Sequence, residues 1–165
     1  MWKFRHKTLI FFSGMLWFAI GMGLLFLGLN LITHAIGNPS HSYPLLQRLT
    51  FLLGTPENGA VAMIAFALFI GYFKGRYALG KSAQRVVKRI RSFPNPCSIF
   101  KMYSWPYYLL ILSMILLGSS FRYFGLSEDI RGFVDVIIGS ALINGGMIYF
   151  RIGMLETNLG VAKSD

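Results

Sequence analysis

Residues 9–32 read LIFFSGMLWFAIGMGLLFLGLNLI and contain no charged side chain. A helix needs about 20 mostly apolar residues to cross about 30 Å of hydrocarbon, so this stretch is long enough to span a bilayer. Three further apolar segments follow at residues 58–73, 102–121 and 132–150, and the last is interrupted only by Asp135. The sequence therefore predicts an integral membrane protein.

The composition leaves room for little besides these segments. Of the 165 residues, 55% are hydrophobic and 13% are charged, whereas soluble domains carry roughly 25% charged residues. We expect an all-α protein with a single membrane domain over residues 1–165. The expected architecture is a four-transmembrane-helix bundle with spans at residues 8–32, 57–74, 104–123 and 131–151.

Positive charge is distributed unevenly over the connectors. If all four segments span, every Lys and Arg except Arg48, Arg122 and Arg131 lies on the side of the two termini. Cytoplasmic loops carry an excess of these residues. We therefore expect both termini in the cytoplasm and insertion into a bacterial inner or plasma membrane. The first apolar stretch exceeds the about 7–15 residues of a signal-peptide core, so it is expected to be retained as an anchor.

The connector on the predicted outer side contains a short amphipathic segment. Leu45, Leu49, Leu52 and Leu53 recur at helical spacing, and Gly54 can end the helix that they form. A helix of this length is too short to span. We expect it to lie at the outer interface or to tuck into the bundle, with a gating or re-entrant element as the alternative.

The connector at residues 75–103 carries most of the positive charge, and its apolar and basic residues alternate as in a basic amphipathic helix. Anionic headgroups attract each cation near the membrane surface by on the order of 1 kcal/mol. The candidates for binding anionic lipid or a partner are Arg76, Lys81, Arg85, Lys88, Arg89 and Arg91. An anion-attracting vestibule is the alternative. Nucleic-acid binding is not expected, because no recognition fold accompanies the charge.

Glycine recurs every seven residues in the first and last predicted spans. The positions are Gly14, Gly21 and Gly28, then Gly132, Gly139, Gly146 and Gly153. A seven-residue repeat keeps a stripe on one helix face, and glycine lets backbones approach closely in lipid. The two stripes predict close helix contacts, either between the first and last spans of one chain or between the subunits of a homo-oligomer.

Three polar residues of the last predicted span are candidates for a solute pathway. Asp135 is the one carboxylate inside a predicted span, and intramembrane acids are rare and often functional. Arg131, one turn earlier, offers the structural alternative of an i, i+4 ion pair. Asn144 lies deeper and either joins helices by hydrogen bonding or lines a polar pathway.

Residue types for other chemistries are scattered along the chain. His6, His34 and His41 fall in different regions, the last two in an expected solvated loop, and Cys97 is the single cysteine. No metal site, cofactor or catalytic set is expected. The sequence favours a homo-oligomeric channel or transporter for a small solute or ion. The alternative is a non-catalytic structural, accessory or lipid-binding subunit of a larger membrane complex.

Overall fold

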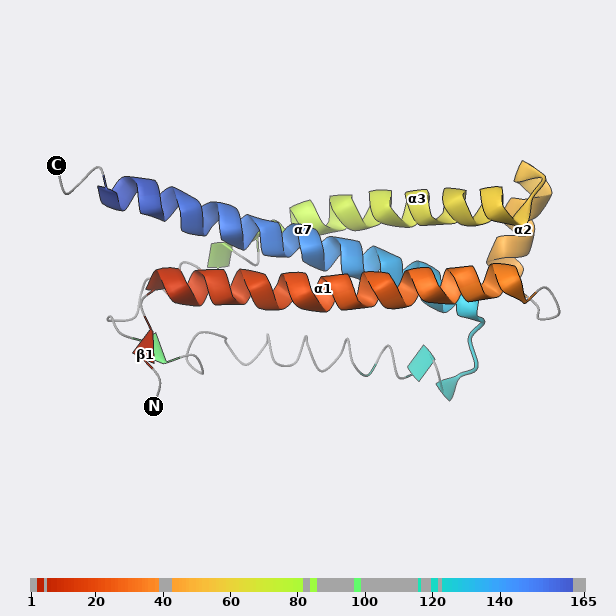
Figure 1. Ribbon diagram of the computed structural model, residues 1–165, viewed down its shortest axis with the longest axis horizontal. Coiled ribbons are helices and arrows are strands. Elements are labelled where there is room, and N and C mark those ends of the chain that lie inside the picture. Colours follow the sequence, from red (N-terminus) through yellow and green to blue (C-terminus); the bar gives the residue numbers. More distant parts are fainter. Residues whose placement is uncertain are drawn as a thin grey trace.

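The computed structural model is dominated by long helices that run side by side along its long axis (Figure 1). It describes residues 3–4, 6–38, 43–81, 84–85, 97–98, 116, 120–121 and 123–161. The helices, in chain order, are α1 (His6–Gly37), α2 (Pro44–Leu53), α3 (Pro56–Lys74) and α7 (Glu128–Val161), with a π-helical turn, η1 (Gly75–Leu79), directly after α3.

Three stretches of helix are long and apolar enough to cross a membrane: Thr8–Gly37, Pro56–Tyr77 and Glu128–Met154. The mainly helical, membrane-type fold is therefore as predicted. The predicted span at residues 104–123 falls largely outside the described residues, so the count of four spans stays a prediction. The first helix extends to Gly37, beyond the predicted end at residue 32, because residues 33–36 contain neither glycine nor proline.

The start of α3 follows from its sequence. Thr55 is extended and its side-chain oxygen accepts the Asn58 N–H at 3.3 Å, while Pro56 occupies the first helical position. This arrangement satisfies one of the free N–H groups at the helix start and uses proline where no N–H is needed. At the other end, helical backbone continues through η1, so the candidate span reaches Tyr77 rather than the predicted residue 74.

The helix α7 is central, because it contacts both α1 and α3. Gly14 of α1 lies beside Gly146 of α7, and Gly28 lies beside Gly132, so these two helices are antiparallel. Residue numbers at neighbouring positions increase in the same direction along α3 and α7, so these two helices are parallel.

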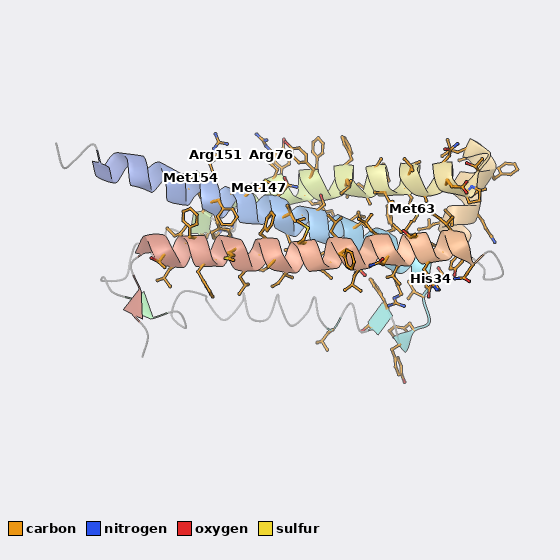
Figure 2. The ribbon with its side chains drawn as sticks, viewed as in Figure 1. His34, Met63, Arg76, Met147, Arg151 and Met154 are labelled. Atoms are coloured by element: carbon orange, nitrogen blue, oxygen red, sulfur yellow. The ribbon has the colours of Figure 1, made fainter. Side chains whose placement is uncertain are left out.

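One cluster of the buried apolar core lies toward the end of the bundle where α1 ends and α3 and α7 begin. Its members come from four helices and the residue before α2, and Met63 is seen inside the bundle in Figure 2. They are Ile32, Ala35, Tyr43, Leu46, Ala60, Met63, Ala67 and Val136. This core fixes the short helix α2 against the three long helices.

The helix α2 only partly follows the predicted amphipathic pattern. Leu45 and Leu49 pack against the core, whereas Leu52 is 75% exposed and Leu53 is 44% exposed. Gly54 ends the helix in the left-handed conformation, with φ at 84°, and its N–H donates to the Thr50 carbonyl at 2.8 Å. The second half of α2 thus presents apolar side chains outward rather than inward.

A pair of two-residue strands accompanies the helices and leaves the fold all-helical. Strand β1 (Lys3–Phe4) pairs antiparallel with β2 (Cys97–Ser98), so that Lys3 faces Ser98 and Phe4 faces Cys97. Extended segments outside a bundle can satisfy their backbone N–H and C=O groups by pairing with each other. The pair brings the N-terminal flank beside the end of the basic connector.

Candidate functional site

The two predicted glycine stripes meet at the contact between α1 and α7. The paired positions are Gly14 with Gly146, Gly21 with Gly139, and Gly28 with Gly132. A Cβ atom added at Gly21 would lie 2.8 Å from the Gly139 carbonyl oxygen, and one added at Gly139 would lie 2.7 Å from the Gly21 carbonyl oxygen. Because both obstacles are backbone atoms, no side-chain rotation can make room for a larger residue.

Both stripes are therefore covered within one chain. Of the two contacts that the repeats predict, the structure contains the one between the first and last spans. A homo-oligomer stays a prediction, and it would have to form through a different surface. Gly153 departs from the pairing, because the ring of Phe11, 3.0 Å from a Cβ placed at Gly153, occupies the space beside it.

A second close contact joins α3 and η1 to α7. A Cβ atom at Gly71 would lie 2.5 Å from the Ile137 carbonyl oxygen, and one at Gly75 would lie 2.6 Å from the Ala141 carbonyl oxygen. These two glycines were not predicted as packing residues. Their four-residue spacing matches the small-residue motif of packed membrane helices. This spacing is the sequence pattern that could have predicted the contact.

The predicted pathway residue Asn144 lies at this second contact. Its side-chain nitrogen donates to the Ser140 carbonyl of its own helix at 2.9 Å, and its Cβ is 2.9 Å from a Cβ placed at Gly75. Ser140 in turn points its hydroxyl at the Leu68 carbonyl of α3, at 3.4 Å. Asn144 thus lies against η1 through its Cβ atom, while its amide bonds within α7.

The other two pathway candidates lie nearer the start of α7. Asp135 and Arg131 are both partly buried, and no ion pair joins them among the interactions of the described residues. Nine residues separate Asp135 from Asn144, which corresponds to roughly 13 Å along a helix. The described structure therefore does not bring the pathway candidates together into one site.

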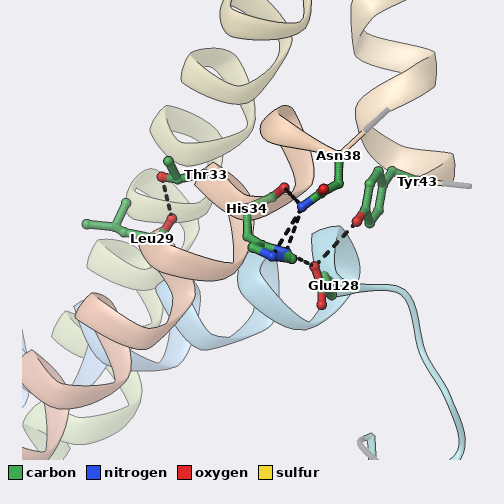
Figure 3. A network of polar contacts seen from close by, with 6 residues as sticks. All are labelled: Leu29, Thr33, His34, Asn38, Tyr43 and Glu128. Carbon is green, nitrogen blue, oxygen red and sulfur yellow. Dashed lines mark hydrogen bonds and ion pairs between the residues drawn. The ribbon is translucent and has the colours of Figure 1, made fainter. Parts of the chain in front are cut away.

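A polar network lies at the end of the bundle where α1 ends and α7 begins (Figure 3). The His34 Nδ1 is 2.8 Å from the Glu128 Oε2, and the Asn38 amide nitrogen is 3.1 Å from the His34 Nε2. The Tyr43 hydroxyl donates to the same Glu128 oxygen at 3.4 Å. Burial first, and then the negative charge of Glu128, raise the pKa of Tyr43, so this hydroxyl remains a donor.

Asp129 is the buried member of this end, at 0% exposure. Its Oδ2 accepts the backbone N–H of Leu45 at 2.8 Å and that of Leu46 at 3.1 Å. Its Oδ1 accepts the N–H of Ile130 at 2.8 Å. One carboxylate from the first turn of α7 thus caps the N-terminus of α2, which has no side-chain cap of its own at Tyr43.

The sequence pattern did not reveal this network. Glu128 and Asp129 fit the ordinary preference of acids for a helix start, and His34 was expected in a solvated loop but lies in the last turn of α1. One signal was present. A helix that begins Tyr43-Pro44-Leu45 lacks a Ser, Thr, Asp or Asn cap, so its free N–H groups need an acceptor from elsewhere in the fold.

The opposite end of the bundle carries the described part of the basic surface. Arg76, Lys81 and Arg85 are exposed, and Arg76 also donates to the Tyr72 hydroxyl at 3.0 Å. Figure 2 shows Arg76 and Arg151 extending from the same side of the bundle, from η1 and α7. The remaining predicted members of this surface, which lie outside the described residues, are Lys88, Arg89 and Arg91.

Neither a cluster of metal ligands among the described residues nor a similar protein indicates a function for these polar and basic residues. Within the part of the chain that the structure describes, no three His, Cys, Asp or Glu side chains gather closely enough to hold a metal ion. No protein-family model, no curated protein and no solved structure matches this chain.

Proposed function

We propose that the chain is a non-catalytic structural or accessory membrane protein rather than a pore. The observation that carries this proposal is the packing of α7, whose backbone is approached closely by glycines of α1 on one face and of α3 and η1 on another. At these positions the two backbones are too close for a water molecule to lie between them. A bundle joined in this way is suited to holding a fixed shape in the bilayer, alone or within a larger membrane complex.

The proposed orientation places both termini and the basic surface in the cytoplasm. Exposed Arg76, Lys81 and Arg85 support it, because cations beside a span favour the cytoplasmic side and attract anionic lipid headgroups near the membrane surface. The polar network of His34 and Glu128 then faces the outer side.

Cysteine labelling tests this orientation with two exposed glutamines. In a Cys97→Ser background, Gln47→Cys in α2 and Gln84→Cys beyond η1 should react with a membrane-impermeant maleimide from opposite sides of the membrane. We expect Gln47→Cys to be labelled on intact cells and Gln84→Cys only after the cells are opened. Labelling of Gln84→Cys on intact cells would invert the proposed topology.

A transport function is the second candidate, because Asp135 is a partly buried carboxylate within a candidate span and has no ion pair among the described residues. Buried charges without a partner are costly and often mark ion pathways. Under this alternative, Asp135 would face a path formed with another part of the chain or with another subunit.

Flux measurements in proteoliposomes separate the two functions. For the structural protein we expect cation, anion and proton fluxes equal to those of empty liposomes, in the wild type and in Asp135→Asn alike. The matched control is Glu57→Gln, which removes an exposed carboxylate from the first turn of α3. A wild-type flux that Asp135→Asn changes and Glu57→Gln leaves intact would establish transport and overturn our proposal.

A further inference from the structure

The outward face of α2 is the part of the described surface that the proposed function leaves unused. Pro44, Gln47, Arg48, Phe51 and Leu52 line a shallow hollow of about 500 Å³ along this face. Phe51 is 91% exposed and Leu52 is 75% exposed. A cation and two large apolar side chains therefore lie next to each other on one face of a single helix, because residues three or four apart are neighbours there.

The position of α2 along the bundle indicates which layer of the membrane its outward face contacts. The candidate spans end at Gly37 in α1 and begin at Pro56 in α3 and at Glu128 in α7, and all three boundaries lie at the end of the bundle where α2 crosses it (Figure 1). Since α2 connects two of these boundaries, it lies at the level where hydrocarbon gives way to headgroups.

Exposed aromatic side chains also occur in the segment that leads into α7 at this end. Tyr123 is 89% exposed and Phe124 is 73% exposed, and their rings are in an edge-on arrangement with centroids 6.0 Å apart. Aromatic residues are enriched at the level of lipid headgroups. Phe51 and this pair thus indicate the same membrane boundary from two separate parts of the chain.

We propose that the outward face of α2 binds an anionic phospholipid, with Arg48 on the phosphate and with Phe51 and Leu52 among the upper acyl-chain carbons. Arg48 forms no ion pair with any described residue, so its guanidinium is available for a phosphate, which it can bind through two parallel hydrogen bonds. An amphipathic helix in the interface buries its apolar side chains just below the headgroups. The Asp129 cap holds the N-terminus of α2, and the core contacts of Leu46 and Leu49 hold the other face of the helix to the bundle, so the lipid-binding face points outward.

An environment-sensitive fluorophore at position 51 tests the proposal. Phe51→Cys, made in the Cys97→Ser background and labelled with nitrobenzoxadiazole, is compared in phosphatidylcholine vesicles with and without phosphatidylglycerol. We expect protection from iodide present on both sides of the membrane, and stronger quenching by lipids with a nitroxide near the headgroup than near the chain end. Phosphatidylglycerol should shift the emission further to the blue.

Substitutions of arginine then test the headgroup contact. Arg48→Gln should abolish the additional shift caused by phosphatidylglycerol while the label stays protected from iodide. Arg48→Lys should keep part of the shift, and Arg151→Gln, an exposed arginine of α7 far from α2, should keep all of it. The proposal fails if iodide reaches the label freely, or if Arg48→Gln leaves the phosphatidylglycerol effect unchanged. It also fails if the label resists both quenchers, or self-quenches until the protein is diluted with lipid, since these results indicate a protein partner or a second copy.

Discussion

Gly21→Ala is expected to destabilise the bundle by about 1–3 kcal/mol, the usual cost of inserting a methyl group where no space exists. The added Cβ would lie 2.8 Å from the Gly139 carbonyl oxygen and 2.8 Å from the Ile143 backbone nitrogen. Neither atom can move without displacing α7 from α1. The measurement is reversible unfolding of the purified protein in mixed micelles, followed by circular dichroism.

Gly23 supplies the matched control for this substitution. It lies two residues away on α1, and nothing lies within 4 Å of a Cβ placed there. Alanine has the higher helix propensity, by about 0.8–1.0 kcal/mol in water, so Gly23→Ala should be neutral or slightly stabilising. The two substitutions thus make the same chemical change on the same helix, and only Gly21→Ala is expected to destabilise the protein. Equal effects of Gly21→Ala and Gly23→Ala would contradict the close contact.

Asp129→Ala is expected to release α2 from the bundle and to lower the free energy of unfolding by roughly 2–4 kcal/mol. The substitution leaves the N–H groups of Leu45 and Leu46 without the acceptor that they have in the structure. A lost helix cap costs about 0.5–2 kcal/mol, and each polar group left buried and unsatisfied costs about 1–3 kcal/mol.

Local unfolding of α2 is measurable without unfolding the long helices. Amide hydrogen exchange should accelerate in residues 45–51, and trypsin should cut after Arg48, because an exposed site in a helix is cleaved only when the helix opens. Glu128→Ala is the control at the neighbouring position. Its side chain is 34% exposed and pairs with His34, so its removal should cost only about 0.2–1 kcal/mol. Similar cleavage in both variants would argue against the capping role of Asp129.

Hydrophobic length and glycine spacing predicted much of the bundle, because both act through local geometry. An uncharged stretch of 24 residues at 9–32 is long enough to span a bilayer, where a helix satisfies every backbone group within one segment. A seven-residue glycine repeat on such a helix forms a stripe. Whether that stripe faces the same chain or another is a property of tertiary arrangement. The repeat alone left both possibilities open, and the structure contains the intramolecular one at Gly21 and Gly139.

The missed features depend on contacts between segments far apart in the sequence. Asp129 caps a helix that begins 85 residues earlier, counted from Pro44, and no local pattern connects an acid in one helix with free N–H groups in another. The exposure of Leu52 was also missed because it depends on contacts between distant segments. Helical spacing grouped Leu52 with Leu45 and Leu49, but the cap and the core contact at Leu46 fix the rotation of α2 and direct Leu52 outward.

Solid-state NMR of glycine-labelled protein in lipid tests the pairing of the stripes most directly, because it needs no substitution. Protein labelled with ¹³C at glycine Cα is diluted into unlabelled protein, and carbon–carbon correlations are recorded. We predict cross-peaks between Gly21 and Gly139 and between Gly28 and Gly132, at an intensity per labelled molecule that dilution does not change. Absence of these cross-peaks, or their loss on dilution, would contradict a bundle closed by glycine contacts within one chain.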